Sequence, residues 1–149
     1  LPLEPARSVR QMLWRLEIKP TWHGTVEGSL SEGRSSRMPV LFFFWASWDC
    51  AGKELERDTF LDPRVNTLLY QDFICAGIDC SDDEVPWVNV AKEQFKVVGI
   101  PTIVIVTPER DELLRFNEYV KPRTFEDGLR RARQLARDKG YDGHYGIDW

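Results

Sequence analysis

The chain has 149 residues, of which 42% are hydrophobic and 30% are charged, and its formal net charge is −4 at pH 7. This length and composition are typical of one globular domain with a buried core, and they exclude disordered and collagen-like chains. The acidic balance argues against nucleic acid as a partner, because proteins that bind it concentrate Lys and Arg on one surface. The longest apolar run, residues 39–46, is far shorter than a membrane-spanning helix, so we expect a soluble domain without a membrane span.

The sequence begins with LPLEPA and without a methionine. A mature chain whose targeting segment has been cleaved would begin in this way, and so would a piece of a larger protein. The sequence leaves both alternatives open, together with the compartment.

Cysteine and histidine are scarce in this chain. There are three cysteines, Cys50, Cys75 and Cys80. A disulfide framework needs a larger and even number of cysteines. The two histidines, His23 and His144, have no metal-ligand spacing with any cysteine. The sequence therefore predicts neither a metal site nor a bound cofactor.

The first part of the chain alternates predicted strands and helices. Residues 14–18 (WRLEI) place apolar side chains at every second position, which is typical of a half-buried strand. Residues 25–35 favour a helix that two glycines weaken. Residues 40–46 (VLFFFWA) are apolar on both faces, as expected of the central strand in a covered sheet. Residues 51–60 carry many charged side chains and predict a surface helix.

Capping and turn residues bound the next elements. Asp62 and Pro63 predict a helix start, because aspartate is a good N-cap and proline suits the first helical turn. Residues 73–78 (FICAGI) indicate a second buried strand, and we expect the acidic loop 79–84 after it to be solvated. Residues 87–95 favour another helix.

The last part of the chain predicts two strands and one helix. Residues 99–106 indicate an apolar strand headed by a proline, which a strand tolerates at its start. A turn leads to a final strand at residues 113–116. Thr124 with Asp127 resembles a capping box, so we expect the last helix to begin there. The C-terminal tail, YDGHYGIDW, either packs on the domain or awaits a partner.

One segment, WASWDCAGKELERDTFLDPRV at residues 45–65, and a GIPT sequence about fifty residues later carry a family resemblance. Together they resemble the thioredoxin superfamily and, within it, the C-terminal thioredoxin-like domain of bacterial transmembrane thiol:disulfide interchange reductases. That domain has a pattern of roughly WCxxCKxxExxxFxDxxV. The matching positions here are Lys53, Glu56, Phe60, Asp62 and Val65.

The resemblance covers most of the chain and implies an α/β thioredoxin-like fold, with a central mixed sheet flanked by helices and a cis-proline loop. It divides the chain into an N-terminal extension with a possible extra strand (1–20), a thioredoxin-like domain (21–138) and a tail (139–149). It also suggests an extracytoplasmic location, either periplasmic or secreted.

In the register of that family, the two redox cysteines fall on Asp49 and Gly52. Cys50 takes the first of the two positions between them, so no CxxC motif is formed. Active members also have a buried acid that moves the proton of the resolving cysteine, and its position corresponds to Phe43. Exchange needs an attacking thiolate and a second thiol that resolves the mixed disulfide. The resemblance therefore implies that this chain has lost dithiol exchange.

Asp49 has a second property that matters at this position. Aspartate is among the best N-cap residues, and a helix N-terminus favours a negative charge. We expect Asp49 to stabilise the helix start where an active enzyme would hold its thiolate. It acts either as a cap alone or with a further ligand-binding or acid–base role.

Pro101 matches the cis-proline of the family, which leaves the neighbouring backbone open to pair with an extended peptide. The predicted groove consists of Trp45, Trp48, Ile100, Pro101 and Thr102. We therefore predict a non-catalytic domain that binds a peptide or protein partner by strand addition at this groove. The alternative is that a cis bond at this position only shapes the fold.

A thiol-dependent function is the second hypothesis. Cys50 comes near a helix N-terminus, where a thiolate is favoured, and we expect Cys80 at the same edge of the sheet. Cys50 alone, or paired with Cys80, would then make the chain an atypical thiol:disulfide oxidoreductase. Cys75 lies in the middle of a strand and is expected to be a small core residue.

Overall fold

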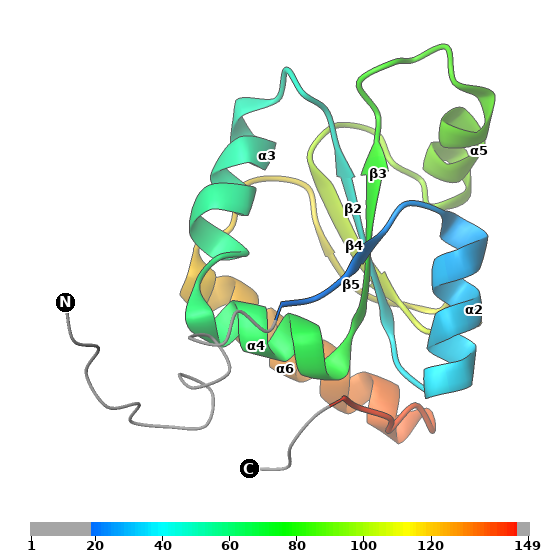
Figure 1. Cartoon of the computed structure of the whole chain (residues 1–149), viewed down its shortest axis with the longest axis vertical. Coiled ribbons are helices and arrows are strands. Elements are labelled where there is room, and N and C mark those ends of the chain that lie inside the picture. The colour runs from blue at the N-terminus through cyan, green and yellow to red at the C-terminus, as the bar shows by residue number, and fades with distance from the viewer. Residues whose placement is uncertain (1–18, 146–149) are drawn as a thin grey trace, which may run out of the picture.

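The computed structural model describes residues 19–145 of the chain. The predicted strand at residues 14–18 and the end of the tail, residues 146–149, lie outside this part. Within it, a five-stranded mixed sheet is covered by helices on both faces (Figure 1). The predicted α/β architecture is confirmed.

The sheet has the strand order β1-β3-β2-β4-β5, in which β2 pairs in parallel with β3 and antiparallel with β4. The strands are β1 (Trp22–His23), β2 (Val40–Trp45), β3 (Ile74–Asp79), β4 (Thr102–Val106) and β5 (Glu112–Phe116). The helices are α2 (Val26–Ser36), α3 (Cys50–Glu54), the π-helix η1 (Leu55–Thr59), α4 (Pro63–Asp72), α5 (Pro86–Gln94) and α6 (Pro122–Asp138).

Strand β2 forms the centre of the molecule because both of its faces are apolar. Val40, Phe42 and Phe44 belong to the core that α2 and α5 cover. Leu41 and Phe43 belong to the second core, beneath η1, α4 and α6. All five side chains are at most 3% exposed, which confirms the predicted central strand. The loop after β2 therefore leaves the sheet from its most buried strand.

The segment after that loop differs from the single helix expected over residues 51–60. The short helix α3 gives way to the π-helix η1, where the amide of Phe60 donates to the carbonyl of Leu55 at 2.8 Å. A π-helical turn bonds residues five positions apart, so it brings Leu55 and Phe60 to one face. Both side chains are buried in the second core, and the charged residues between them remain outside.

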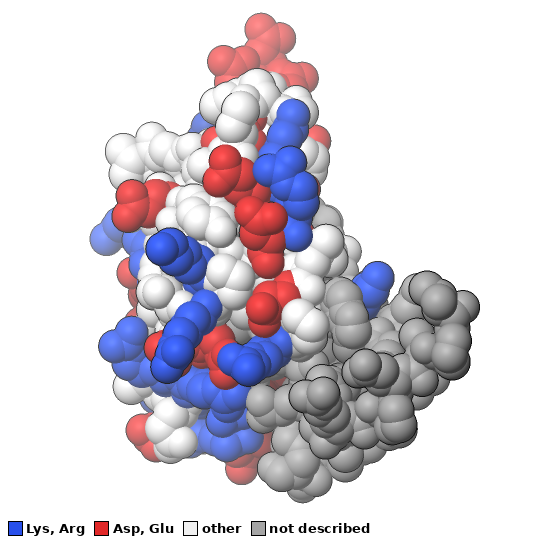
Figure 2. Space-filling view, turned by 90° about the vertical axis from the view of Figure 1, so that its left-hand side faces the viewer, with Lys and Arg blue, Asp and Glu red and all other residues white. Residues whose placement is uncertain are grey.

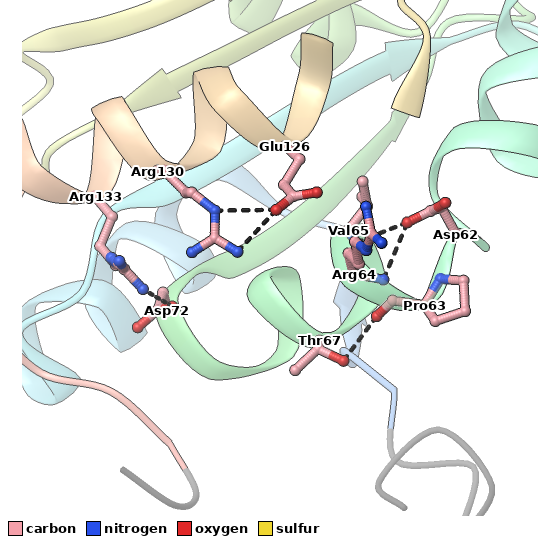
Figure 3. Close-up of polar contacts among 9 residues, drawn as sticks. All are labelled: Asp62, Pro63, Arg64, Val65, Thr67, Asp72, Glu126, Arg130 and Arg133. Carbon is pink, nitrogen blue, oxygen red and sulfur yellow. Dashed lines mark hydrogen bonds and ion pairs between the residues drawn. The ribbon is translucent and has the colours of Figure 1, made fainter. Parts of the chain in front are cut away.

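Helix α4 begins as predicted, with Asp62 as its N-cap. The Asp62 carboxylate accepts hydrogen bonds from the amides of Arg64 at 3.0 Å and Val65 at 3.3 Å (Figure 3). At the other end of α4, the buried Asp72 accepts a hydrogen bond from Arg133 of α6 at 3.1 Å. This ion pair holds α6 against α4, under the same face of the sheet as η1.

Helix α6 begins one turn before the position expected from the sequence. Its N-cap is Lys121, which makes no side-chain cap, and Pro122 lies in the first turn. The prediction that Thr124 and Asp127 form a capping box was wrong, because proline already holds φ at a helical value ahead of them. The apolar stripe of α6 consists of four buried residues: Phe125, Leu129, Ala132 and Ala136.

The described part of the C-terminal tail packs on the domain. The amide of Tyr145 donates to the carbonyl of Gln71 at 2.7 Å, and its hydroxyl donates to Glu32 of α2 at 2.7 Å. Hydrogen bonds from Tyr145 and then Ser36 lower the pKa of the Glu32 carboxyl below its ordinary value. Of the two alternatives for the tail, residues 141–145 follow the first.

Candidate functional site

The start of α3 is organised by the side chain of Asp49. Its carboxylate accepts hydrogen bonds from the amides of Ala51 at 3.2 Å and Gly52 at 3.1 Å. The residue is only 9% exposed, although it stands at a helix end near the surface. The N-cap role predicted for Asp49 is confirmed, and two backbone N–H groups that an α-helix leaves without partners are satisfied by one carboxylate.

Gly52 lies directly beneath that carboxylate. A Cβ atom at Gly52 would come within 2.8 Å of Oδ2 of Asp49, closer than Cβ atoms approach other atoms in proteins. The same Cβ would be 3.7 Å from Cζ of Phe43, whose ring is buried. The structure therefore brings together Phe43, Asp49 and Gly52, the three positions that the family resemblance connects. A carboxylate fills the space that a side chain at Gly52 would need.

The three cysteines are free thiols in very different surroundings. Cys50 is the first residue of α3, and its side chain is exposed. Cys80 follows β3 and is buried, with its Sγ 3.6 Å from the carbonyl oxygen of Ile78. Burial raises the pKa of the Cys80 thiol, and the charge of Lys92 lowers it only in part. Cys80 is thus a poorer source of thiolate than a solvated cysteine.

Cys75 is buried in the middle of β3, as expected of a core residue. Burial raises the pKa of its thiol far above the ordinary range, because desolvation disfavours the charged thiolate. Cys75 is therefore chemically silent.

A groove of about 370 Å³ opens beside the exposed side chain of Trp48, which is 65% accessible. Three loops and helix α5 contribute to it, and its lining combines apolar and polar groups. The residues that line it are Trp48, Cys80, Ser81, Asp83, Lys92, Val97, Val98, Gly99 and Ile100. Two of the predicted groove residues, Trp48 and Ile100, therefore do meet in one depression.

The Ile100–Pro101 peptide bond is cis, as the family resemblance implies. Pro101 and Thr102 follow the groove residue Ile100 in the chain and are buried. The Thr102 hydroxyl donates to the carbonyl of Gly99 at 2.6 Å, which holds the loop before the proline in place. Neither Pro101 nor Thr102 lines the depression.

Trp45 lies elsewhere. It lines a second cavity, of about 510 Å³, together with Phe43 and Gly77. The positions of Trp45 and Trp48 differ because Trp45 is still in β2, where side chains alternate between the two faces, whereas Trp48 belongs to the loop after it. Of the predicted groove residues, Trp48 and Ile100 thus line the groove and Trp45 lines the second cavity, whereas the two remaining residues line neither.

Several groove residues could not be found by sequence reasoning. Val97 and Val98 come after α5, and Val98 is 98% exposed. An apolar side chain in a loop with no periodic pattern was the only available signal. The Ser81 hydroxyl accepts a hydrogen bond from the amide of Ser47 at 2.8 Å, so it joins the loop after β3 to the loop that carries Trp48. Within residues 19–145, no cluster of three His, Cys, Asp or Glu side chains is placed to hold a metal ion.

The fold, the cis-proline and the capped helix start define the class of protein as a thioredoxin-like domain. Residues 21–108, more than half of the chain, match the family described as thioredoxin-like, and the chain belongs to that family. It is similar to the thiol:disulfide interchange protein DsbD of Vibrio vulnificus (strain CMCP6), with 32% identity over 78 residues. That match spans 52% of this chain but only 13% of DsbD.

Solved structures agree with this family. The thioredoxin from Thermus thermophilus has a TM-score of 0.70 and 19% identity, covering 82% of this chain and 93% of that one. The oxidised C-terminal domain of DsbD from Neisseria meningitidis has a TM-score of 0.64 and 17% identity, covering 75% and 99%. At these identities the likeness shows the fold. In the described part of this chain, no helix is both long and apolar enough to span a bilayer.

Proposed function

We propose that this chain is a non-catalytic thioredoxin-like domain that binds a peptide or protein partner through the groove beside Trp48 and Pro101. The observation that carries this proposal is the position of the Asp49 carboxylate. It occupies the helix start with two hydrogen bonds and leaves no space for a side chain at Gly52. A site arranged in this way is built for stability and lacks the two sulfurs of a dithiol enzyme.

The chemistry of exchange explains why this arrangement matters. One thiolate attacks a substrate disulfide, and a second thiol then displaces the mixed disulfide. Asp49 and Gly52 replace both groups in the family register, and neither a carboxylate nor a hydrogen atom can form a disulfide. The ring of Phe43, near Gly52, also provides no proton acceptor. Three requirements of the reaction are therefore missing at one place.

The groove retains what peptide binding requires. Trp48 exposes a large flat apolar surface, and Ile100 lines the same depression. A peptide that enters in an extended conformation would place an apolar side chain against Trp48 and pair its backbone with the loop before Pro101. Tryptophan is a frequent energetic anchor in such interfaces.

An exposed thiol at Cys50 is the one observation that favours a thiol-dependent redox function instead. Its candidate partner, Cys80, is buried and has a raised pKa, so a Cys50–Cys80 pair would lack an accessible second thiol. We therefore place this function second.

A disulfide-reduction assay separates the two functions. We expect the chain, and equally Cys50→Ser, to give no catalysed reduction of insulin disulfides by dithiothreitol. In the Cys50→Ser background, the double change Asp49→Cys with Gly52→Cys should restore measurable turnover, whereas the matched control Asp49→Cys alone should not. Turnover by the natural chain that Cys50→Ser abolishes would overturn the proposal.

Partner binding is tested separately with an acetylated hexapeptide of alternating valine and threonine. We expect its addition to shift the amide resonances of residues 98–100 and the indole resonance of Trp48. Trp48→Ala should weaken binding by about tenfold. The control Trp87→Ala removes another exposed tryptophan, outside the groove, and should leave binding unchanged. Equal effects of the two substitutions would contradict the assignment of the groove.

The family resemblance supports two further parts of the proposal. The thioredoxin-like domain extends over residues 21–138, and the location is extracytoplasmic, as expected of a relative of DsbD. The region of similarity is only 13% of DsbD. The activity of the whole DsbD protein is therefore not part of this proposal.

A further inference from the structure

A hollow of about 510 Å³ lies on the face of the sheet that carries Phe43, and it is distinct from the groove beside Trp48. It opens between β1, η1 and the start of α4, and none of the described residues lines both depressions. Among the residues that line it are Trp22, Phe43, Trp45, Phe60, Leu61 and Gly77. Sites for small molecules commonly measure about 300–1,000 Å³ and have mostly apolar walls, so this hollow has a suitable size and character.

The aromatic walls of the hollow hold one another in place. The rings of Phe43 and Phe60 meet edge to face, with centroids 5.0 Å apart and an interplanar angle of 88°. The ring of Trp22 lies 5.4 Å from that of Phe60. Phe43 and Phe60 are buried, whereas Trp22 is 39% exposed and presents part of its ring to solvent. Rings packed in this way form a surface against which a further flat ring can stack.

Gly77 leaves open space over the sheet within this hollow. It pairs with Phe43 in the ladder between β2 and β3, and it has no positive φ that would demand a glycine. A Cβ atom there would be 3.4 Å from Nε1 of Trp45 and 3.9 Å from Cε3 of Trp22, both ordinary contact distances. A small side chain would therefore fit at this position, and its absence leaves room beside both indole rings.

The indole N–H of Trp45 is the polar group that borders this space. Its Nε1 is the atom nearest to the position that a Cβ of Gly77 would take. The Trp45 side chain is partly buried, and within residues 19–145 its N–H donates to no acceptor. A tryptophan N–H that is removed from water usually has a hydrogen-bond partner. An acceptor atom on a molecule in the hollow would supply that partner.

The charges around the hollow do not favour a charged ligand. Lys19 and Glu56 both line it, and they carry opposite signs. Figure 2 shows acidic and basic side chains together on the side of the molecule where α3 and α4 lie. An ion that exchanged water for aromatic walls would lose hydration without a net opposite charge to compensate. A neutral molecule avoids that cost.

We propose that this hollow binds a neutral, flat aromatic molecule that carries a carbonyl oxygen. The rings of the molecule stack against Trp22 and Phe60 over Gly77, and its carbonyl oxygen accepts a hydrogen bond from the Trp45 indole. Burial of the apolar rings supplies affinity, and the single hydrogen bond sets the orientation. The site is independent of partner binding beside Trp48.

Coumarin, which has two fused rings and one carbonyl group, is the probe for this site. We expect it to bind the natural full-length chain saturably. Nuclear Overhauser effects should connect its ring protons with the Gly77 α-protons and with the indole N–H proton of Trp45. Absence of saturable binding, or cross-peaks to the groove beside Trp48 in place of Gly77, would overturn the proposal.

The role of the indole N–H is tested with Trp45→Phe, which keeps an aromatic ring and removes the donor. Naphthalene, a pair of fused rings without oxygen, is the matched control ligand. We expect the substitution to weaken coumarin binding by about fivefold, as for the loss of one ordinary hydrogen bond, and to change naphthalene binding by less than about twofold. Equal weakening of both ligands would contradict the proposed hydrogen bond.

The space over Gly77 is tested by filling it. Gly77→Val places a side chain that suits a strand within the hollow and should weaken the binding of both ligands by at least about tenfold. The matched control is Gly99→Val in the other groove, where a Cβ atom would meet no atom within 4 Å. It should leave the binding of both ligands unchanged. Equal effects of the two valine substitutions would place the ligand elsewhere and overturn the assignment.

Discussion

Gly52 and Gly77 both lie near Phe43, and the space above each glycine is used in a different way. Above Gly52, the Asp49 carboxylate lies within 2.8 Å of where a Cβ atom would be. Above Gly77, the nearest atom would be 3.4 Å away, and a hollow of about 510 Å³ opens there. Phe43 comes within 3.7 Å of the first position and lines the second.

The difference shows that the space above a glycine can be filled by a nearby side chain or left open within one sheet fold. At Gly52 the missing side chain is compensated locally, by a residue three positions earlier in the sequence that also caps the helix. At Gly77 no residue of the described chain fills the space, and the hollow stays open. A local replacement can be recognised from a motif, whereas an open hollow depends on how the whole sheet is assembled.

The largest effect should come from removing the ring that the two regions share. We expect Phe43→Ala to lower the free energy of unfolding by about 3–5 kcal/mol, because a fully buried aromatic side chain is lost and a cavity remains. Urea unfolding monitored by circular dichroism gives the value. The amide resonances of Gly52 and Gly77 should both shift.

The control for this prediction is Phe43→Leu, which keeps most of the apolar volume and should cost about 1–2 kcal/mol. A shift confined to one of the two glycines would show that Phe43 does not connect the regions, and the comparison would then fail.

The next largest effect concerns the helix start itself. Asp49→Ala should destabilise the chain by about 1–2 kcal/mol, because the amides of Ala51 and Gly52 lose their acceptor. Asp49→Asn keeps an acceptor oxygen without the charge, and should recover most of that stability. Thermal unfolding of the two variants measures the difference. If Asn were as harmful as Ala, the charge of Asp49 would outweigh its hydrogen bonds.

The two glycines themselves give the sharpest test of the comparison. Gly52→Ala should destabilise the chain by about 1 kcal/mol, because the new methyl group displaces the Asp49 carboxylate from its hydrogen bonds. Gly77→Ala should change stability by less than about 0.5 kcal/mol, because its methyl group fits at ordinary contact distance. Urea midpoints of both variants provide the measurement.

A double-mutant cycle identifies the cause of that difference. In the Asp49→Ala background the carboxylate is absent, so Gly52→Ala should become nearly neutral, and the two changes should be strongly non-additive. The same background should leave the effect of Gly77→Ala unchanged. Additive behaviour of Asp49 with Gly52 would refute the proposed competition for one space.

Local signals in the sequence predicted the parts of the molecule that depend on neighbouring residues. The central strand β2 and the start of α4 at Asp62 could both be predicted, because apolar runs and capping residues act within a few positions. The same reasoning failed at α6. This helix begins at Pro122, so Thr124 and Asp127 lie inside it and form no capping box. A local sequence pattern indicates only a preference for a helix start, and a start signal earlier in the chain can override that preference.

The site was predictable only where the motif fixed it. Asp49, Gly52 and Phe43 were connected by the family register alone, and the structure places the three residues close together. The assignment of Trp45 to the groove did not hold in the same way, because the alternation of β2 turns it toward Gly77. Val98 was missed because the path of a loop is set by long-range packing, which leaves no period in the sequence.

The smallest effect is expected where the tail meets α2, beside a third hollow that Pro20, Glu32 and Tyr145 line together. Tyr145→Phe removes the hydroxyl that donates to Glu32. It should lower the free energy of unfolding at pH 7 by less than about 1 kcal/mol, because both groups are partly solvated. Residues 141–145 would then lose part of their attachment to the domain.

The pH dependence of that loss distinguishes a charged hydrogen bond from simple packing. The pKa of Glu32 is lower in the folded chain than its ordinary value of 4.5, so the stabilisation is fully present above that value. As the pH falls through the folded-state pKa, the carboxylate is protonated and the stabilisation disappears. The stabilities of the natural chain and Tyr145→Phe should therefore differ at pH 7 and converge in acid. A difference that stays constant from pH 7 to pH 3 would show that the Tyr145 ring acts by packing, without help from the Glu32 charge.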